Sequence, residues 1–428
     1  MESLMETNRP KRIILIGAGL RGKTYTDKMA ELDGKFRIVA VAEPIDDRRR
    51  YIQKKHGIPD ADCETSWEPL LERPKFADAV VIATMDRDHY APAMQAIARG
   101  YDILLEKPMS AVPDECRKIA RAAEQAGVRV LVCHVLRYTA FFRTLKAIID
   151  SGRLGEVVHI QHAECVGNVH QSHSFVRGNW KNSEESSCMI LQKSCHDMDI
   201  LQWLIGKPCR RVHSFGGLYY FHAGNAPKGA PERCIDGCPV GGSCPYNAVR
   251  LYLEDKKNLW FRTSATHRVA PTDADLEEAL RTTDYGRCVF RCGNNVVDHQ
   301  TVNLEFEGGA TVSFTMCAFN RGERTIRIMG TKGELRARMG NPEIECYDFE
   351  TKRTETLTVG DMIRDQSIVG GHGGGDDGIV RAFADVLNGD SSGVCTISET
   401  CENHMIAFAA EKSRTEGRVV DLSEFAAT

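Results

Sequence analysis

A lysine stands between a glutamate and a proline at the end of an apolar run, in the stretch Leu104-Leu105-Glu106-Lys107-Pro108. Proline restricts the residue before it to extended conformations, so Lys107 is expected to be held at the carboxyl end of a strand. Open α/β sheets bind their ligands at that edge. A lysine there can hydrogen-bond a reacting hydroxyl and favour its alkoxide character, and Glu106 would orient the lysine or a ribose. The plainer interpretation is an ion pair at a strand end.

A second pattern with chemical meaning is the glycine-rich stretch 17–22, which follows the apolar run 13–16 and precedes an expected helix. Glu43 ends the next apolar strand, 21 positions after Gly22. This context is typical of a dinucleotide site, although a turn without a ligand would also fit. Gly17 would make the tight turn, Gly19 would let the backbone approach a pyrophosphate, and Gly22 would let helix and strand pack closely. The predicted cofactor-binding residues of the turn are Gly17, Gly19, Leu20, Arg21 and Gly22.

The residue Glu43 also bears on the choice of cofactor. A carboxylate at the end of the second strand would hydrogen-bond the adenosine ribose hydroxyls and repel a 2′-phosphate, which favours NAD over NADP. Three arginines, Arg48, Arg49 and Arg50, follow it, and one of them could reach a 2′-phosphate. A run of arginines on a helix is more often a solvated face, so we expect NAD.

These residues are carried by alternating strands and helices as far as about Cys133. The strands are continuously apolar, as in a parallel sheet covered on both faces, which predicts a doubly wound Rossmann domain over residues 1–133. The expected strands lie within 13–16, 36–44, 77–85, 101–108 and 128–135, and the expected helices within 22–32, 48–57, 89–100 and 114–127.

After Cys133 the apolar residues recur with period two, and two segments have hairpin turns, at 307–309 and 331–333. We therefore expect a second α/β domain over residues 134–428, with an open, mostly antiparallel sheet and helices on one side. An irregular stretch rich in Gly, Pro and Cys, at about 221–295, is interpreted as an insertion into it.

Together these motifs resemble the Gfo/Idh/MocA family of oxidoreductases. The family pattern has a Thr at a strand end, a His about five residues later and Glu-Lys-Pro after the following strand, which matches Thr84, His89 and residues 106–108. The resemblance implies that Thr84 and His89 belong to the cofactor site and that the bond before Pro108 is cis. The usual Pro and Asn after the Thr are Met85 and Asp86 here.

The resemblance extends to residues 189–206, which we expect to form one helix. Family members carry an Asp and, four residues later, a His; the His matches His196, but Gln192 stands in place of the Asp. Gln cannot relay a proton. We predict His196 as the proton acceptor and Lys193, one turn before it, as an electrostatic partner or substrate ligand. A structural histidine is the alternative.

Candidate substrate residues lie before this helix, within it, and near the C-terminus. A loop rich in histidine, also holding His170, precedes the helix, and aromatic faces with charged donors commonly bind sugars; a surface loop is the alternative. In the family, a glycine-rich helix start faces the substrate and corresponds to residues 370–378. The predicted substrate residues are His173, Arg177, Trp180, Asp199, His372 and Asp376.

Cysteines are clustered in the insertion, as Cys234-x3-Cys238-x5-Cys244 and Cys288-x3-Cys292. Four thiolates would make a structural zinc site, and the metal would hold together a segment that lacks its own core. The predicted ligands are Cys234, Cys238, Cys244 and Cys288. Their spacing is looser than that of paired C-x2-C motifs, so reduced thiols without a metal are the competing interpretation. An iron–sulfur cluster is a third interpretation, less favoured than either.

The composition favours a small-molecule partner. The 428 residues carry a formal net charge of −4, with no basic excess for nucleic acid or an anionic membrane surface. The N-terminal stretch lacks the apolar core of a signal peptide and no run approaches a membrane span, so a cytoplasmic location is expected, with the 16 cysteines mostly reduced.

The function expected from all this is NAD-dependent hydride transfer to or from a secondary hydroxyl of a sugar, polyol or glycoside. Two alternatives stay open: a glycosidase that retains NAD and oxidises its substrate transiently, as some relatives do, and a non-catalytic sensor that binds NAD and a sugar. The exposed face of the open sheet is expected to form a homo-dimer or homo-tetramer.

Overall fold

Six parallel strands form the first sheet, in the order β3-β2-β1-β4-β5-β6. The computed structural model describes residues 9–360 and 371–426, without the side chains of 371 and 372. The strands are β1 (Lys11–Ile16), β2 (Phe36–Ala42), β3 (Cys63–Glu64), β4 (Ala79–Ile82), β5 (Asp102–Leu105) and β6 (Val130–Val132), and the connecting helices are α2 (Leu20–Glu31), α3 (Asp46–His56), α4 (Glu68–Glu72), α5 (Tyr90–Ala98) and α6 (Pro113–Ala126).

Both faces of this sheet are buried, as its continuously apolar strands predict. Ile13 and Leu15 pack with α2 and α3, whereas Ile14 and Ile16 pack on the other side with α5 and α6. Alternate residues of one strand thus serve two hydrophobic layers. The strand order is that of a Rossmann domain, which confirms the predicted fold class.

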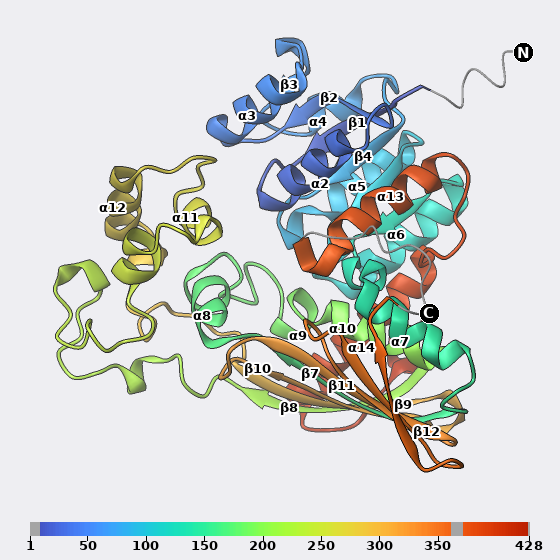
Figure 1. Cartoon of the computed structure of the whole chain (residues 1–428). Helices are drawn as coiled ribbons and strands as arrows, with labels where there is room; N and C mark the ends of the chain where they lie inside the picture. Colours follow the sequence, from blue (N-terminus) through green and yellow to red (C-terminus); the bar gives the residue numbers. More distant parts are fainter. Residues whose placement is uncertain (1–8, 361–370, 427–428) are drawn as a thin grey trace, which may run out of the picture.

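The second sheet has nine strands, in the order β14-β13-β12-β11-β7-β10-β9-β8-β15, and only β7 and β10 pair in parallel. Between it and the first sheet lie the helices α7 (Ala140–Asp150), α9 (Met189–Gln192), α10 (Cys195–Ile205) and α14 (Ile397–Glu416) (Figure 1). The two predicted hairpins are present, as β9–β10 and β11–β12. The strands are β7 (Val157–Cys165), β8 (Cys209–Gly217), β9 (His299–Phe306), β10 (Thr311–Cys317), β11 (Glu323–Gly330), β12 (Gly333–Arg338), β13 (Glu343–Asp348), β14 (Arg353–Thr358) and β15 (Val420–Asp421).

The helices of the second half do not all stay with the second sheet. α13 (Gly375–Leu387) packs its side chains Ile379, Val380 and Phe383 against the first sheet, beside α2. The chain therefore returns to the Rossmann domain after leaving it. The remaining α-helices of the described residues are α8 (Asn168–Gln171), α11 (Leu259–Thr266) and α12 (Asp273–Thr282).

The single helix predicted over 189–206 is wrong: it is two helices, α9 and α10, broken at Lys193 and Ser194. Ser194 has φ −99° and ψ 8°, outside helical geometry. Serine competes for backbone hydrogen bonds and has modest helix propensity, so the break costs little locally. Its consequence is that the main-chain carbonyl of Gln192 is available to a partner from another element.

The insertion is the segment 218–298, between β8 and β9, and it contains α11 and α12 (Figure 1). The expectation that it lacks a core is wrong. Phe221, Tyr246 and Phe290 belong to one buried apolar cluster, and Tyr252 and Phe261 to a second. Aromatic side chains bury enough area to hold so short a segment together.

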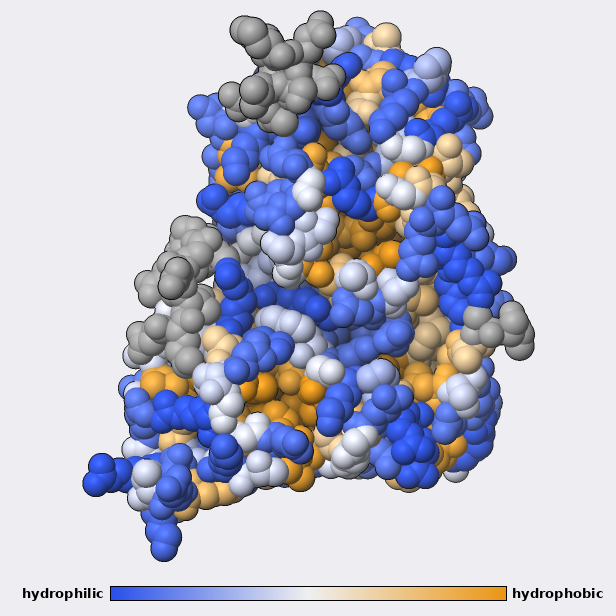
Figure 2. Space-filling view, turned by 90° about the vertical axis from the view of Figure 1, so that its right-hand side faces the viewer, coloured by the Kyte–Doolittle hydropathy of each residue, from blue (hydrophilic) through white to orange (hydrophobic). Residues whose placement is uncertain are grey.

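Hydrophilic side chains cover much of the face shown in Figure 2, with hydrophobic residues in patches between them. Within the described part of the chain, no helix is both long and apolar enough to cross a bilayer.

Candidate active site

The glycine turn between β1 and α2 is built for a close backbone approach. Gly17 has φ +86°, and a Cβ there would lie 2.5 Å from the carbonyl oxygen of Ala83. A Cβ on Gly22 would lie 2.0 Å from the carbonyl oxygen of Gly17, so both positions require glycine. A Cβ on Gly19 would meet only the Nη1 of Arg48, at 3.7 Å. Because α2 starts there without a side-chain cap, its first N–H groups are free to bind a phosphate.

Glu43 closes this turn from the end of β2. Its carboxylate accepts hydrogen bonds from the backbone N–H groups of Ala18, at 2.7 Å, and Ile45, at 2.9 Å. A carboxylate has about four acceptor positions, so two remain for the hydroxyls of a ribose. The geometry of Gly19 and Glu43 together fits an NAD molecule lying across the carboxyl edge of the sheet.

Arg48 links the insertion to the cofactor turn, a contact that sequence analysis missed. Its guanidinium donates to the carbonyl oxygen of His267 and contacts the Nδ1 of the same residue, both at 3.0 Å. The backbone N–H of Val269 donates to Asp47, also on α3, at 2.8 Å. The insertion therefore reaches over to the helix beside the glycine turn. The run of three arginines at 48–50 could have indicated this contact, but we interpreted it as a solvated face.

Lys107 points from the end of β5 toward the broken helix. Its Nζ donates to the carbonyl oxygen of Gln192 at 2.5 Å, which is the carbonyl exposed by the break between α9 and α10. The peptide bond between Lys107 and Pro108 is cis, as the family resemblance implied. The side chain thus stands between the Rossmann edge and the second domain.

Glu106 forms a buried ionic network rather than a contact with the lysine ammonium. It accepts from Arg21 Nε and from the Tyr25 hydroxyl, both at 2.6 Å, and from the backbone N–H of Lys107 at 2.8 Å. Burial raises the pKa of Glu106, but Arg21 and Lys107 outweigh it and leave that pKa lowered. Glu106 is therefore ionised at neutral pH.

Arg21 also pairs with Asp376, at 2.7 Å. Asp376 is 2% exposed, so the prediction that it contacts substrate is not supported. It instead ties the start of α13 to the cofactor turn. The side chain of His372, predicted to act with it, lies outside the described residues.

His89 supports the loop that carries Lys107. Its Nδ1 lies 2.7 Å from the carbonyl oxygen of Pro108 and its Nε2 lies 3.2 Å from that of Thr84. The Thr84 hydroxyl donates to the carbonyl oxygen of Asp88 at 3.0 Å. His89 is 1% exposed, so it positions the two strand ends rather than offering an open ligand.

Two of the positions that depart from the family pattern, Asp86 and Gln192, are connected through Trp180. Its indole N–H donates to Asp86 at 3.1 Å, and its carbonyl oxygen accepts from the side-chain amide of Gln192 at 3.0 Å. The other oxygen of Asp86 accepts from Ser187 at 2.8 Å. With its N–H engaged, Trp180 offers a substrate only its ring. The departures from the family pattern at Asp86 and Gln192 could have indicated that the two positions are connected.

A second lysine stands near the first. Lys193 is 3.3 Å from Glu164, which also pairs with Arg324 at 2.5 Å. The pKa of Lys193 is lowered by burial; Glu164 opposes this, and the positive charges of Arg324 and Lys107 reinforce it. A lysine with a lowered pKa gives up its proton more readily.

His196, on α10, is 8% exposed and belongs to a group of three histidines. Its ring centroid is 5.9 Å from that of His134, which is 5.4 Å from that of His404. Burial lowers the pKa of His134 and of His404 to about 3, so both are neutral. His404 accepts from the N–H of Met109 at 3.0 Å. His134 follows β6 at the ligand edge, a signal that sequence analysis passed over.

Three predicted substrate residues are buried elsewhere. His173 contacts the Tyr252 hydroxyl at 2.9 Å, and burial lowers its pKa to about 3. Arg177 donates to the carbonyl oxygen of Tyr246, and Asp199 pairs with Arg137, both at 2.8 Å. His173 and Arg177 are 2% exposed and Asp199 is fully buried, so their contacts are structural.

The four cysteines predicted as zinc ligands line one pocket of the insertion. They are not arranged as a ready-made ion site: among residues 9–360 and 371–426, no three His, Cys, Asp or Glu side chains are placed to hold a metal ion. All 16 thiols are free of disulfides.

Comparison with known families matches nearly the whole chain. Residues 11–134 match the GFO_IDH_MocA model, described as an oxidoreductase family with an NAD-binding Rossmann fold. Residues 146–422 match the companion model, the C-terminal alpha/beta domain of that oxidoreductase family.

Individual relatives are more distant. YteT of Bacillus subtilis, named provisionally as an oxidoreductase, is 26% identical over 357 residues, covering 75% of this chain and 79% of YteT. The 2,7-anhydro-N-acetylneuraminate hydratase of Mediterraneibacter gnavus is 29% identical over 203 residues, covering 47% and 51%. Inositol 2-dehydrogenase 4 of Saccharopolyspora erythraea is 29% identical over 209 residues, covering 48% and 57%. The chain spans only about half the length of the last two.

Two solved structures share the fold across the chain. An inositol dehydrogenase homolog from Azotobacter vinelandii, complexed with NADH and myo-inositol, superposes with a TM-score of 0.68 at 17% identity, covering 96% of this chain and 98% of that one. The WlbA dehydrogenase of Bordetella pertussis, complexed with NADH and UDP-GlcNAcA, gives 0.67 at 19% identity, covering 97% and 98%. At such identities the likeness establishes the fold alone.

Proposed function

This chain belongs to the Gfo/Idh/MocA family of NAD-binding oxidoreductases, and we propose that it transfers hydride between NAD and a secondary hydroxyl of a sugar, polyol or glycoside. The observation that carries the proposal is the position of Lys107, at the ligand edge of the first sheet and directed at the break between α9 and α10. A cation at the meeting point of the two domains suits a hydroxyl that must become a carbonyl.

Bound NAD would supply the hydride acceptor. The residues of this chain would do the rest. Lys107 would donate a hydrogen bond to the reacting oxygen, exchanging the Gln192 carbonyl for substrate. Lys193, with its lowered pKa, and His196 are the groups available to take the proton. Glu106 stays ionised and holds Arg21, so it fixes the glycine turn rather than exchanging protons.

The preference for NAD over NADP rests on Glu43. Both oxygens of its buried carboxylate face backbone N–H groups of the turn and of the segment after β2. A 2′-phosphate placed there would meet a negative charge at close range, which costs free energy without a compensating cation. The Arg48 guanidinium is close enough to interact with Glu43, but its Nε and Nη2 are bound to His267, so we expect it to offset this repulsion only in part.

The proposed substrate class draws on the names of relatives. Inositol 2-dehydrogenases are among them, and two structural neighbours are dehydrogenases or their homologs solved with myo-inositol or a UDP-sugar. The polar residues around Lys107 suit a hydroxyl-rich ligand.

We also propose a homo-oligomer formed through the open face of the second sheet. That face holds a hollow of about 560 Å³ lined by polar and charged side chains of β7, β10, β11, β12 and β13. Sedimentation of the purified protein tests this: a monomer at micromolar concentration would contradict it.

The function is tested with purified protein and a panel of polyols, sugars and aryl glycosides, following NADH absorbance and free sugar together. NADH formed in step with substrate loss, with the glycosidic bond intact, supports the proposal. Repeated release of aglycone without added NAD and without net NADH would reject it in favour of the NAD-retaining glycosidase. Binding of a sugar with no turnover of any panel member would favour the sensor.

A further inference from the structure

Four cysteines from two separate segments of the insertion meet at one cavity. Cys234, Cys238, Cys244 and Cys288 line a space of about 20 Å³, enough for one atom the size of a water molecule. The catalytic role proposed above does not use this cavity. Its other lining residues include Arg177 and Tyr246.

Backbone hydrogen bonds hold the two segments in place. An antiparallel bridge joins Arg233 to Arg287, and the N–H of Cys288 donates to the carbonyl oxygen of Glu232 at 2.9 Å. Two tight turns lie between Cys238 and Cys244. The N–H of Gly241 donates to the carbonyl oxygen of Cys238, and the N–H of Cys244 donates to that of Val240, both at 2.9 Å. Three thiols come from one loop and the fourth from the segment bridged to it.

Arg177 is the second, independent observation at this cavity. It is 2% exposed, and its Nη2 lies 3.6 Å from the sulfur of Cys234. Arg177 also donates to the carbonyl oxygens of Arg287 and Tyr246, both at 2.8 Å, and its Nη1 has no hydrogen-bond partner among the described residues. An arginine stays charged, and a buried charge without a counter-charge is unfavourable.

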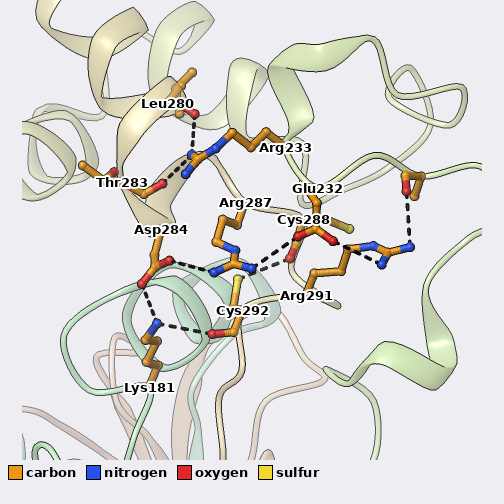
Figure 3. A network of polar contacts seen from close by, with 11 residues as sticks. Lys181, Glu232, Arg233, Leu280, Thr283, Asp284, Arg287, Cys288, Arg291 and Cys292 are labelled. Carbon is orange, nitrogen blue, oxygen red and sulfur yellow. Dashed lines mark hydrogen bonds and ion pairs between the residues drawn. The ribbon is translucent and has the colours of Figure 1, made fainter.

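Nearby cationic side chains, in contrast to Arg177, each face a carboxylate. Figure 3 shows Arg287 and Arg291 directed at Glu232, each at 3.3 Å, and Lys181 directed at Asp284, at 2.5 Å. Arg177 has no carboxylate among its contacts. The groups that raise its pKa against the effect of burial are Tyr252 and cysteines of the insertion. Thiolate ligands on a bound metal ion would supply the negative charge that Arg177 lacks.

We propose that this pocket binds one zinc ion through the thiolates of Cys234, Cys238, Cys244 and Cys288, with Arg177 as the counter-charge. Four thiolates around one divalent ion carry two negative charges, of which the guanidinium offsets one. The cavity volume admits a single ion and not a four-iron cluster. Without metal the thiols are not placed as ligands, so binding would draw the four sulfurs inward, to about 2.3 Å from the ion.

Cys292 is left out of the ligand set and serves as the matched control. It is buried beside the pocket, and its thiol donates to the carbonyl oxygen of Cys288 at 3.2 Å. Burial raises the pKa of Cys292 to about 11, which keeps it a thiol.

The test is the metal content of the full-length protein, purified under reducing conditions without chelators and measured by mass spectrometry. About one zinc per chain is expected for the wild type and for Cys292→Ser, as a four-ligand site requires. Cys244→Ser should retain less than about a fifth of that. In Arg177→Met, which leaves all four ligands, the zinc affinity measured by competition with a chromogenic chelator should fall about tenfold or more.

Three results would overturn the proposal. The first is iron and sulfide with absorbance near 400 nm, which would indicate a cluster. The second is wild-type protein that contains no zinc and takes none up in calorimetric titration. The third is Cys244→Ser that keeps a full equivalent of zinc. None of these readouts depends on catalytic activity, so they separate this proposal from the proposed oxidoreductase function.

Discussion

Replacing Lys107 with Met gives the sharpest test of the catalytic proposal. Met keeps the length and apolar stem of the side chain and removes only the ammonium group. If that group hydrogen-bonds the reacting oxygen in the transition state, kcat should fall by about 10²–10⁴-fold, which is about 3–5.5 kcal/mol of barrier. The binding of NAD should change little, because the Nζ is directed at Gln192 and not at the glycine turn.

The stability cost of this substitution can be worked out separately. The lysine Nζ makes one hydrogen bond to a main-chain carbonyl, at the end of a four-residue helix. Losing a hydrogen bond that involves a charged group costs about 1.5–3 kcal/mol when the partner is buried. The loss of activity should therefore exceed what destabilisation explains, provided that assays are run well below the unfolding temperature of the variant.

Steady-state kinetics at saturating NAD and substrate, with urea unfolding in parallel, separate the two effects. Lys107→Arg retains the charge and a donor but offers a fixed, planar group, so it should restore stability more than kcat. Lys118→Met, on the exposed side of α6, is the control and should leave both unchanged. A Lys107→Met enzyme that keeps kcat within about threefold of the wild type would refute the assignment.

Three further results are expected, for the choice of cofactor, for Arg48 and for the buried histidines. Fluorescence titration should show NAD binding at least about tenfold tighter than NADP, and Glu43→Ala should narrow the difference; tighter NADP binding by the wild type would contradict the role of that carboxylate. Arg48→Met should speed NAD dissociation several-fold in a displacement experiment, because it removes the hydrogen bond that ties the insertion to the helix beside the glycine turn. An unchanged dissociation rate would contradict this role of Arg48. The pKa values of His134, His173 and His404 are about 3 in the folded protein and about 6.5 in the unfolded chain, so the unfolded chain binds more protons below pH 6.5. The free energy of unfolding should therefore fall as the pH drops below 6.5, by up to about 4 kcal/mol per pH unit for the three groups together. A free energy of unfolding that stays constant between pH 6.5 and 5 would show that the three histidines titrate normally in the folded protein.

Local sequence patterns were sufficient for the parts of the site that depend on local conformation. The tight turn at Gly17, the close packing at Gly22 and the strand that delivers Lys107 follow from residue types and spacing, and the structure has them in place. Long-range contacts were not readable in the same way. Arg21 and Asp376 are 355 positions apart and form one ion pair. Each looked like a separate ligand residue, because a sequence shows that a charge exists but not which charge faces it.

The break between α9 and α10 was missed for a related reason. Apolar spacing across 189–206 fits one helix, and nothing in the segment forbids it. What the spacing omits is the partner: a carbonyl exposed at Gln192 is tolerable only because Lys107, from the other domain, donates to it. The same holds for His173 and Arg177, whose residue types suit a sugar site. Their burial depends on the insertion, whose folded core was not expected from its irregular composition.

We propose that Gln192, which stands where the family resemblance predicts an Asp, changes which group acts as the base. A Gln cannot carry a proton away from His196, and its side-chain amide is occupied by Trp180. Next to it, Lys193 is a partly buried lysine with a lowered pKa, near enough to Lys107 for the two positive charges to affect each other. When one of two neighbouring lysines holds the substrate oxygen as a cation, the other is the more readily deprotonated, since losing its proton removes the repulsion between them. Lys107 would then act as the cationic donor and Lys193 as the proton acceptor.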